Sequence, residues 1–87
     1  MKGSEKMSYL TEERILCKNI KYLRFQHNLS KKEMAKKLGI GIASLSKIES
    51  GILPPRLTHE LLLRIHEHFG ISPHKILTEE IEDTDSF

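Results

Sequence analysis

Apolar side chains recur at helical spacing between positions 15 and 25 of this chain: Ile15, Leu16, Ile20, Leu23 and Phe25. Thr11 is one of the residue types that cap helices, and the two glutamates that follow it suit the positive end of a helix dipole. Asn28 tolerates the left-handed backbone conformation in which many helices end. We therefore expect a first helix from Thr11 to about His27, preceded by a flexible arm over residues 1–10.

Two short helices are expected in the middle of the chain. Ser30 and Glu33 have the spacing of a capping box, in which each side chain accepts a hydrogen bond from the other residue's backbone N–H. Gly39 is expected to end the helix that begins there. A further helix should run from about Ile42 to Glu49 and stop at Gly51, where glycine can take a C-cap conformation.

These two helices are expected to share one apolar wall. Small Ala35 leaves room for the second helix to cross the first closely, and Gly39 supplies a position that can take a positive φ. The larger apolar residues would fill the space between them: Met34, Leu38, Ile40, Leu45 and Ile48. This spacing is typical of a helix-turn-helix, which binds DNA by placing its second helix in the major groove.

The rest of the chain is also predicted to be helical. Tandem prolines prevent residues 52–56 from being helical throughout, because proline lacks a backbone donor and restricts the residue before it. Thr58 is expected to cap a fourth helix that ends at Gly70, and Ser72 a fifth that runs through Leu77. Because no segment alternates with a strand period, we expect an all-α, compact five-helix bundle over residues 11–78.

The net charge of +2 is unevenly distributed along the chain. The last nine residues contain acids and no base: Glu79, Glu80, Glu82, Asp83 and Asp85. Residues 1–78 therefore hold all 14 basic side chains and 7 acidic ones, a net charge of +7. Such a basic body suits a polyanion, of which nucleic acid is the commonest. The acidic tail, residues 79–87, is expected to be a solubilising end, although competition with DNA or contact with a partner is an alternative.

Double-stranded DNA is the expected partner, and the residues expected to read it lie at the start of the third helix. Ile42 or Ala43 can contact a thymine methyl, Ser44 and Ser46 can hydrogen-bond bases or phosphates, and Lys47 can meet a guanine edge or a phosphate. Gly41 begins this reading edge.

Phosphate contacts are expected from the start of the preceding helix. Backbone N–H groups at a helix N-terminus bind anions, and here Ser30, Lys31 and Lys32 combine such groups with two lysine charges. Arg56 is expected to grip the strand beyond the reading helix.

From Asn19 to Leu77 the chain resembles the Cro and phage-repressor type of helix-turn-helix domain, also called the xenobiotic-response-element family. The shared pattern consists of an apolar-x-x-Leu-Arg motif, a Leu-Ser cap, a small residue, a turn glycine and an Ile-Glu-x-Gly motif. These elements are Ile20–Arg24, Leu29-Ser30, Ala35, Gly39 and Ile48–Gly51. The resemblance implies a lambda-repressor-like fold and an ion pair between Arg24 and Glu49 that ties the first helix to the third, with a structural role.

Two departures from the family pattern affect the expected DNA site. Polar residues are frequent in the family where this chain has Gly41, Ile42 and Ala43, and glutamine is common where it has Lys31. Specificity would then rest on methyl contacts and DNA shape, or Ile42 would belong to a protein-binding surface.

Other chemistries have little support in the sequence. The histidines at positions 59, 66, 68 and 74 lack the spacing of a metal site, because His66 and His68 point to different faces of a helix. Cys17 is expected to be a small packing residue, with redox sensing as the alternative. We expect no metal, no cofactor and no enzymatic activity.

The function expected from these features is that of a small transcriptional regulator, a repressor that acts as a cytoplasmic homodimer. No apolar run is long enough to span a membrane, and a single cysteine fits a reducing compartment. The expected dimer surface contains Leu53, Ile71, Ile76 and Leu77, unless these residues close the core. The alternative function is a protein-interaction or antitoxin-like module that binds a partner protein through Ile42.

Overall fold

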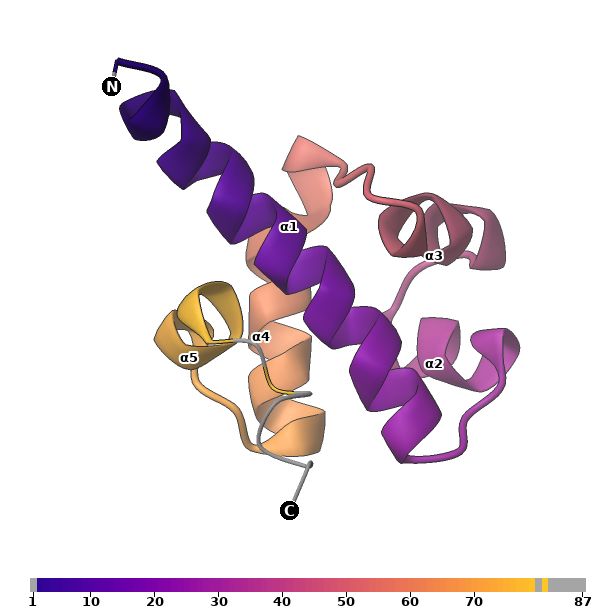
Figure 1. Cartoon of the computed structure of the whole chain (residues 1–87). Helices are drawn as coiled ribbons and strands as arrows, with labels where there is room; N and C mark the ends of the chain where they lie inside the picture. The colour runs from indigo at the N-terminus through magenta and orange to yellow at the C-terminus, as the bar shows by residue number, and fades with distance from the viewer. Residues whose placement is uncertain (1, 80, 82–87) are drawn as a thin grey trace.

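The structure is a computed structural model, which describes residues 2–79 and 81 of the chain, with side chains from residue 12 onward. Every described element is helical, in the order α1 (Lys2–Gln26), α2 (Lys31–Leu38), α3 (Ile42–Glu49), a 3-10 turn (Pro55–Leu57), α4 (Thr58–Phe69) and α5 (Pro73–Thr78). Figure 1 shows α1 crossing the whole bundle, with α2 and α3 on one side of it and α5 on the other. The all-α, five-helix fold class predicted from the sequence is confirmed.

One core joins all five helices. Its buried apolar residues are Leu16, Cys17, Ile20 and Leu23 of α1, Met34, Ala35 and Leu38 of α2, Leu45 and Ile48 of α3, Leu61 and Ile65 of α4, and Ile76 of α5. The wall predicted between α2 and α3 is therefore present, with Ile40 half-buried beside it. Each Leu or Ile buried in this way contributes about 2 kcal/mol through removal of its apolar surface from water.

The burial of Phe25 and of Ile76 differs from the sequence-based expectation. Phe25 is 56% exposed, so the buried stripe of α1 ends at Leu23. Ile76 is fully buried in the core, while Leu53, Ile71 and Leu77 are half-buried against it. For Ile76 the structure therefore shows the alternative given above, in which this side chain closes the core and does not contribute to a dimer surface.

The first helix begins earlier than the sequence pattern predicted. α1 starts at Lys2 and passes through Thr11 without a break, so residues 2–10 are helical and continuous with the rest of α1. The physical reason is that no glycine or proline lies between Ser4 and Gln26, while an interior threonine costs a helix less than about 1 kcal/mol. A cap residue in the sequence permits a helix to start but does not force it to.

The predicted ends of α2 and α3 are confirmed at the level of single hydrogen bonds. Ser30 Oγ accepts from the backbone N–H of Glu33 at 3.0 Å, and Glu33 Oε1 accepts from that of Ser30 at 2.8 Å. Gly39 ends α2 with φ of 72°, a left-handed value that suits glycine. α3 spans Ile42–Glu49 and is followed by Gly51 at φ of 102°.

The start of α4 differs from the prediction. Thr58 is the first residue of α4 and has helical φ and ψ of −57° and −49°, so it is not the residue that caps the helix from outside. Its Oγ1 instead donates to the carbonyl of Pro54 at 3.3 Å. The 3-10 turn that precedes it leads directly into α4, because proline fixes φ in a range that helices share.

A buried asparagine links α1 to α5 and to residues just after it. Asn19 is 1% exposed, and its Nδ2 donates to the carbonyls of Ile76 and Glu79, both at 2.8 Å. Its Oδ1 accepts from the backbone N–H of Ile81 at 3.0 Å. Glu79 and Ile81 are therefore both bonded to α1, and both lie inside the stretch assigned to the acidic tail. The rest of that tail, residues 80 and 82–87, lies outside the described residues.

Asn19→Asp is expected to lower the free energy of unfolding at neutral pH by about 3 kcal/mol, because the carboxylate cannot donate to two buried carbonyls and loses hydration. Urea unfolding measures this loss. As pH falls, protonation of the new carboxyl restores a donor, so the deficit should shrink. Asn28→Asp makes the same amide-to-acid change at an exposed position just beyond α1 and should cost less than about 1 kcal/mol. Wild-type stability in Asn19→Asp would show that these bonds contribute nothing.

Candidate nucleic-acid interface

The turn between α2 and α3 determines how these helices present their side chains. Gly39 and Ile40 continue the hydrogen bonding at the end of α2, since the N–H of Ile40 donates to the carbonyl of Ala35 at 3.0 Å. Gly41 then takes extended φ and ψ of −82° and 162° and begins α3 without a side-chain cap. Figure 1 shows the two helices next to each other beside the C-terminal half of α1. This is the arrangement of a helix-turn-helix.

The first predicted group, at the start of α2, is accessible. Ser30, Lys31 and Lys32 are all exposed, and α2 begins at Lys31, so these residues form its N-terminal end. Both the Oγ lone pair and the backbone N–H of Ser30 are engaged with Glu33 in the capping box, so its contribution to an anion would come through the hydroxyl hydrogen. Lys31 Nζ donates to Ser46 Oγ of α3 at 3.3 Å. The structure therefore brings one phosphate candidate and one base-reading candidate into direct contact.

The second predicted group lies at the start of α3. Gly41, Ile42 and Ala43 are exposed, with Ile42 at 47%, while Leu45 and Ile48 turn into the core. The two serines are half-buried, and Lys47 is exposed in the last turn. This edge is thus accessible and mainly apolar. Its polar groups are Ser44, Ser46 and Lys47.

Arg56 stands apart from these groups. Arg56 is exposed in the 3-10 turn, and residues 50–55 separate it in sequence from Glu49 at the end of α3.

An ion pair fixes α3 against α1. Arg24 Nε donates to Glu49 Oε2 at 2.6 Å and Arg24 Nη2 to Oε1 at 3.0 Å, which makes the contact bidentate. The two side chains are only 12% and 6% exposed. Arg24 Nη1 also donates to the carbonyl of Leu29 at 3.2 Å, in the loop before α2. One arginine thus connects α1, the start of the motif and the reading helix.

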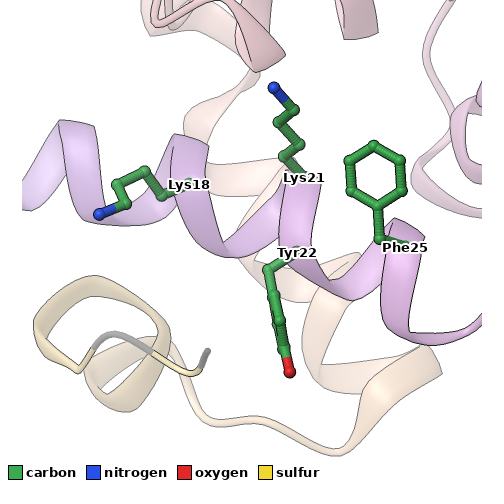
Figure 2. Close-up of a pocket in the computed structure, with 4 residues that line it drawn as sticks. All are labelled: Lys18, Lys21, Tyr22 and Phe25. Atoms are coloured by element: carbon green, nitrogen blue, oxygen red, sulfur yellow. The ribbon is translucent and has the colours of Figure 1, made fainter. Parts of the chain in front are cut away.

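A shallow hollow lies where α1, α2 and α3 meet, and it contains residues that the sequence pattern did not assign to the site. Lys21 and Phe25 line it together with Arg24, Lys31, Ser46, Glu49 and Ser50. The guanidinium carbon of Arg24 lies 4.5 Å from the centroid of the Phe25 ring, a cation–π contact that leaves the other face of the ring accessible. Figure 2 shows Lys21 and Phe25 pointing to the same side of α1, and Tyr22 to the opposite side. The helical spacing of Lys21, Arg24 and Phe25 was the available signal for this shared face.

Cys17 and the histidines were the candidates for redox or metal chemistry. Burial, and to a lesser extent the negative charge of Glu13, raise the pKa of the Cys17 thiol above its ordinary value of 9.0. A thiol with a raised pKa is mostly protonated near pH 7 and is a poor nucleophile. The histidines at positions 59, 66, 68 and 74 are exposed. Among the described residues, no three His, Cys, Asp or Glu side chains are grouped as metal ligands, and no helix has the length and apolar character needed to cross a membrane.

Comparisons with known proteins agree with this geometry. Residues 20–76 match the model of a family described as helix-turn-helix. The chain is also 34% identical, over 64 residues, to an uncharacterized HTH-type transcriptional regulator of Methanocaldococcus jannaschii, and the match covers 74% of this chain and 94% of that protein. No solved structure matches significantly. The family match covers well over half of the chain and includes α2, α3 and the ion pair, so this protein belongs to the Cro/C1-type helix-turn-helix family.

Proposed function

We propose that this protein is a DNA-binding transcriptional regulator that places α3 in the major groove of double-stranded DNA. Two neighbouring surfaces carry the proposal: the exposed residues Gly41–Ala43 and Lys47 of α3, and the exposed cationic start of α2. The turn between α2 and α3 joins them. Membership of the helix-turn-helix family and a relative named as a transcriptional regulator support it.

The proposed division of roles follows the chemistry of the two groups. Lys31, Lys32 and Arg56 neutralise phosphates, and Ser30 donates a hydrogen bond to one. These contacts set the position of the domain on the duplex without reading sequence. Gly41, Ile42, Ala43, Ser44 and Lys47 form the base-reading edge, in which Ile42 and Ala43 contact thymine methyl groups. Ser46 accepts a hydrogen bond from Lys31, so in this proposal its main role is to position that lysine.

The regulator is proposed to act as a cytoplasmic repressor and as a homodimer. Two-fold symmetry would set two α3 helices one DNA turn apart, roughly 34 Å, on a near-palindromic site. With Ile76 in the core, the dimer surface has to come from accessible side chains, of which Leu63 of α4 is 49% exposed. Sedimentation velocity over a range of protein concentrations measures the association directly.

Selection of bound fragments from a genomic pool tests the proposal. We expect enrichment of fragments that share a short, nearly palindromic sequence with half-sites one turn apart. Enrichment of a single half-site would support DNA binding and contradict the proposed homodimer. No enrichment of any fragment would reject the proposed function.

The exposure of Ile42 favours one second candidate function, a protein-interaction or antitoxin-like module. An isoleucine at this position fits a thymine methyl or an apolar pocket on a partner protein. Ile42→Gln distinguishes the two functions. Altered sequence preference among bound duplexes supports base reading, whereas unchanged DNA binding at every sequence supports a role for Ile42 in contacting protein.

A further inference from the structure

α1 presents a row of cations that the DNA site described above does not include. Arg14, Lys18 and Lys21 are exposed and lie four and three residues apart, so they share one face of the helix over roughly 10 Å. The family match begins at Ile20, so Arg14 and Lys18 precede it.

This row continues the surface of the helix-turn-helix. A shallow hollow is lined by Arg14, Lys18 and Lys21 together with Ser50 and Gly51 at the C-terminal end of α3. Lys21 also lines the neighbouring hollow that contains Lys31 and Ser46. In Figure 2, the Lys21 side chain extends away from α1 on the same side as Phe25, which belongs to that second hollow. Lys21 therefore connects the row on α1 with the proposed phosphate contacts of α2.

The charge along this path is positive. Two carboxylates adjoin the row, and one of them, Glu49, is held by the guanidinium of Arg24 at 2.6 Å. The other, Glu13, is exposed and acts on Cys17, one helical turn further along α1. The two cations at the ends of the row, Arg14 and Lys21, are exposed and outnumber Glu13, the carboxylate that lies outside the Arg24–Glu49 pair. A polyanion that passes the end of α3 would gain from contact with this row.

We propose that Arg14 and Lys21 bind the DNA backbone where one strand passes the C-terminal end of α3, so that α1 is a third DNA-contacting helix. This inference rests on the proposed function. The phosphate path then runs from Lys31 through Lys21 to Arg14, and it lengthens the footprint beyond the contacts of α2 and α3. These contacts carry charge and no base information, so they act equally on all sequences.

The double variant Arg14→Gln/Lys21→Gln tests this inference by titration of a selected duplex and an unrelated duplex at several salt concentrations. Lys18 is left unchanged because it makes a further interaction within the chain. Loss of two phosphate contacts should reduce the slope of log affinity against log salt by about 2. Near 0.1 M salt the affinity for both duplexes should fall on the order of 50-fold.

Two controls make the outcomes distinct. Lys75→Gln removes one exposed lysine from α5, on the opposite side of α1, and should leave the slope unchanged. Circular dichroism of the double variant should match that of the wild type, since both altered residues are exposed. A wild type that binds DNA steeply with salt, alongside a double variant with the same slope, would overturn this inference alone. A wild type that binds no duplex would overturn the proposed function itself.

Discussion

Glu49→Gln is expected to lower the free energy of unfolding by about 3 kcal/mol, because it leaves the guanidinium of Arg24 largely buried without a counter-charge. A loss of this size is a large part of the stability of so small a domain and should lower the melting temperature by more than about 10 °C. Arg24 also bonds the carbonyl of Leu29, so the connection between α1 and the start of α2 should loosen at the same time. Urea and thermal unfolding measure both effects.

An exposed ion pair in the same chain supplies the matched control. Arg64 and Glu60 are separated by one helical turn of α4, at 3.5 Å, and their side chains are 40% and 55% exposed. Glu60→Gln should cost less than about 0.5 kcal/mol, because water already solvates both charges. The double variant Arg24→Met/Glu49→Leu removes both buried charges and should be more stable than Glu49→Gln alone. Equal losses for Glu49→Gln and Glu60→Gln would contradict a structural role for the buried pair.

Lys31→Ala/Lys32→Ala is expected to weaken DNA binding on the order of 50-fold near 0.1 M salt and to reduce the salt slope by about 2, through loss of two phosphate contacts. The loss should be the same for a selected duplex and an unrelated one. Both lysines are exposed, so the stability of the fold should change by less than about 0.5 kcal/mol. Fluorescence anisotropy titrations with the two duplexes measure affinity and slope together.

Lys47→Ala and Ile42→Gln provide the contrast. Both residues are exposed on α3, and changes there should alter the ratio of affinities between the two duplexes. Ser46→Ala should reproduce a small part of the Lys31 effect, since it removes the hydroxyl that Lys31 contacts. The proposed division of roles would be untenable if the α2 and α3 variants changed the two affinities in the same proportion.

Local chemistry explains why the helix ends of the motif could be read from the sequence. The capping box of Ser30 and Glu33 and the left-handed Gly39 depend on residues within one turn, so residue type and spacing determine them. Thr58 marks the limit of such reasoning. Its hydroxyl could cap a helix, but the preceding prolines start a 3-10 turn that brings Thr58 inside α4.

Contacts between distant segments could not be predicted from spacing. Asn19 looks like any polar residue of a helix, and its burial is evident only once α5 packs against α1, with Ile76 lying 57 residues further along the chain. The contact between Lys31 and Ser46 likewise depends on how α2 and α3 cross. Lys21 and Phe25 were missed as site residues for the same reason, since α3 and α2 supply the rest of their hollow. The Arg24–Glu49 pair was the exception, because a family resemblance supplied it.

The salt dependence of duplex binding tests the central proposal, DNA binding through this helix-turn-helix, most directly. The wild type should bind a genomically selected duplex, and log affinity should fall linearly with log salt between about 50 and 200 mM, with a slope of about 0.9 per phosphate contacted. The three proposed phosphate-binding cations, Lys31, Lys32 and Arg56, predict a slope of at least about 2.7 in magnitude. Affinity that does not change with salt, or absence of binding at the lowest salt, would contradict the proposed function.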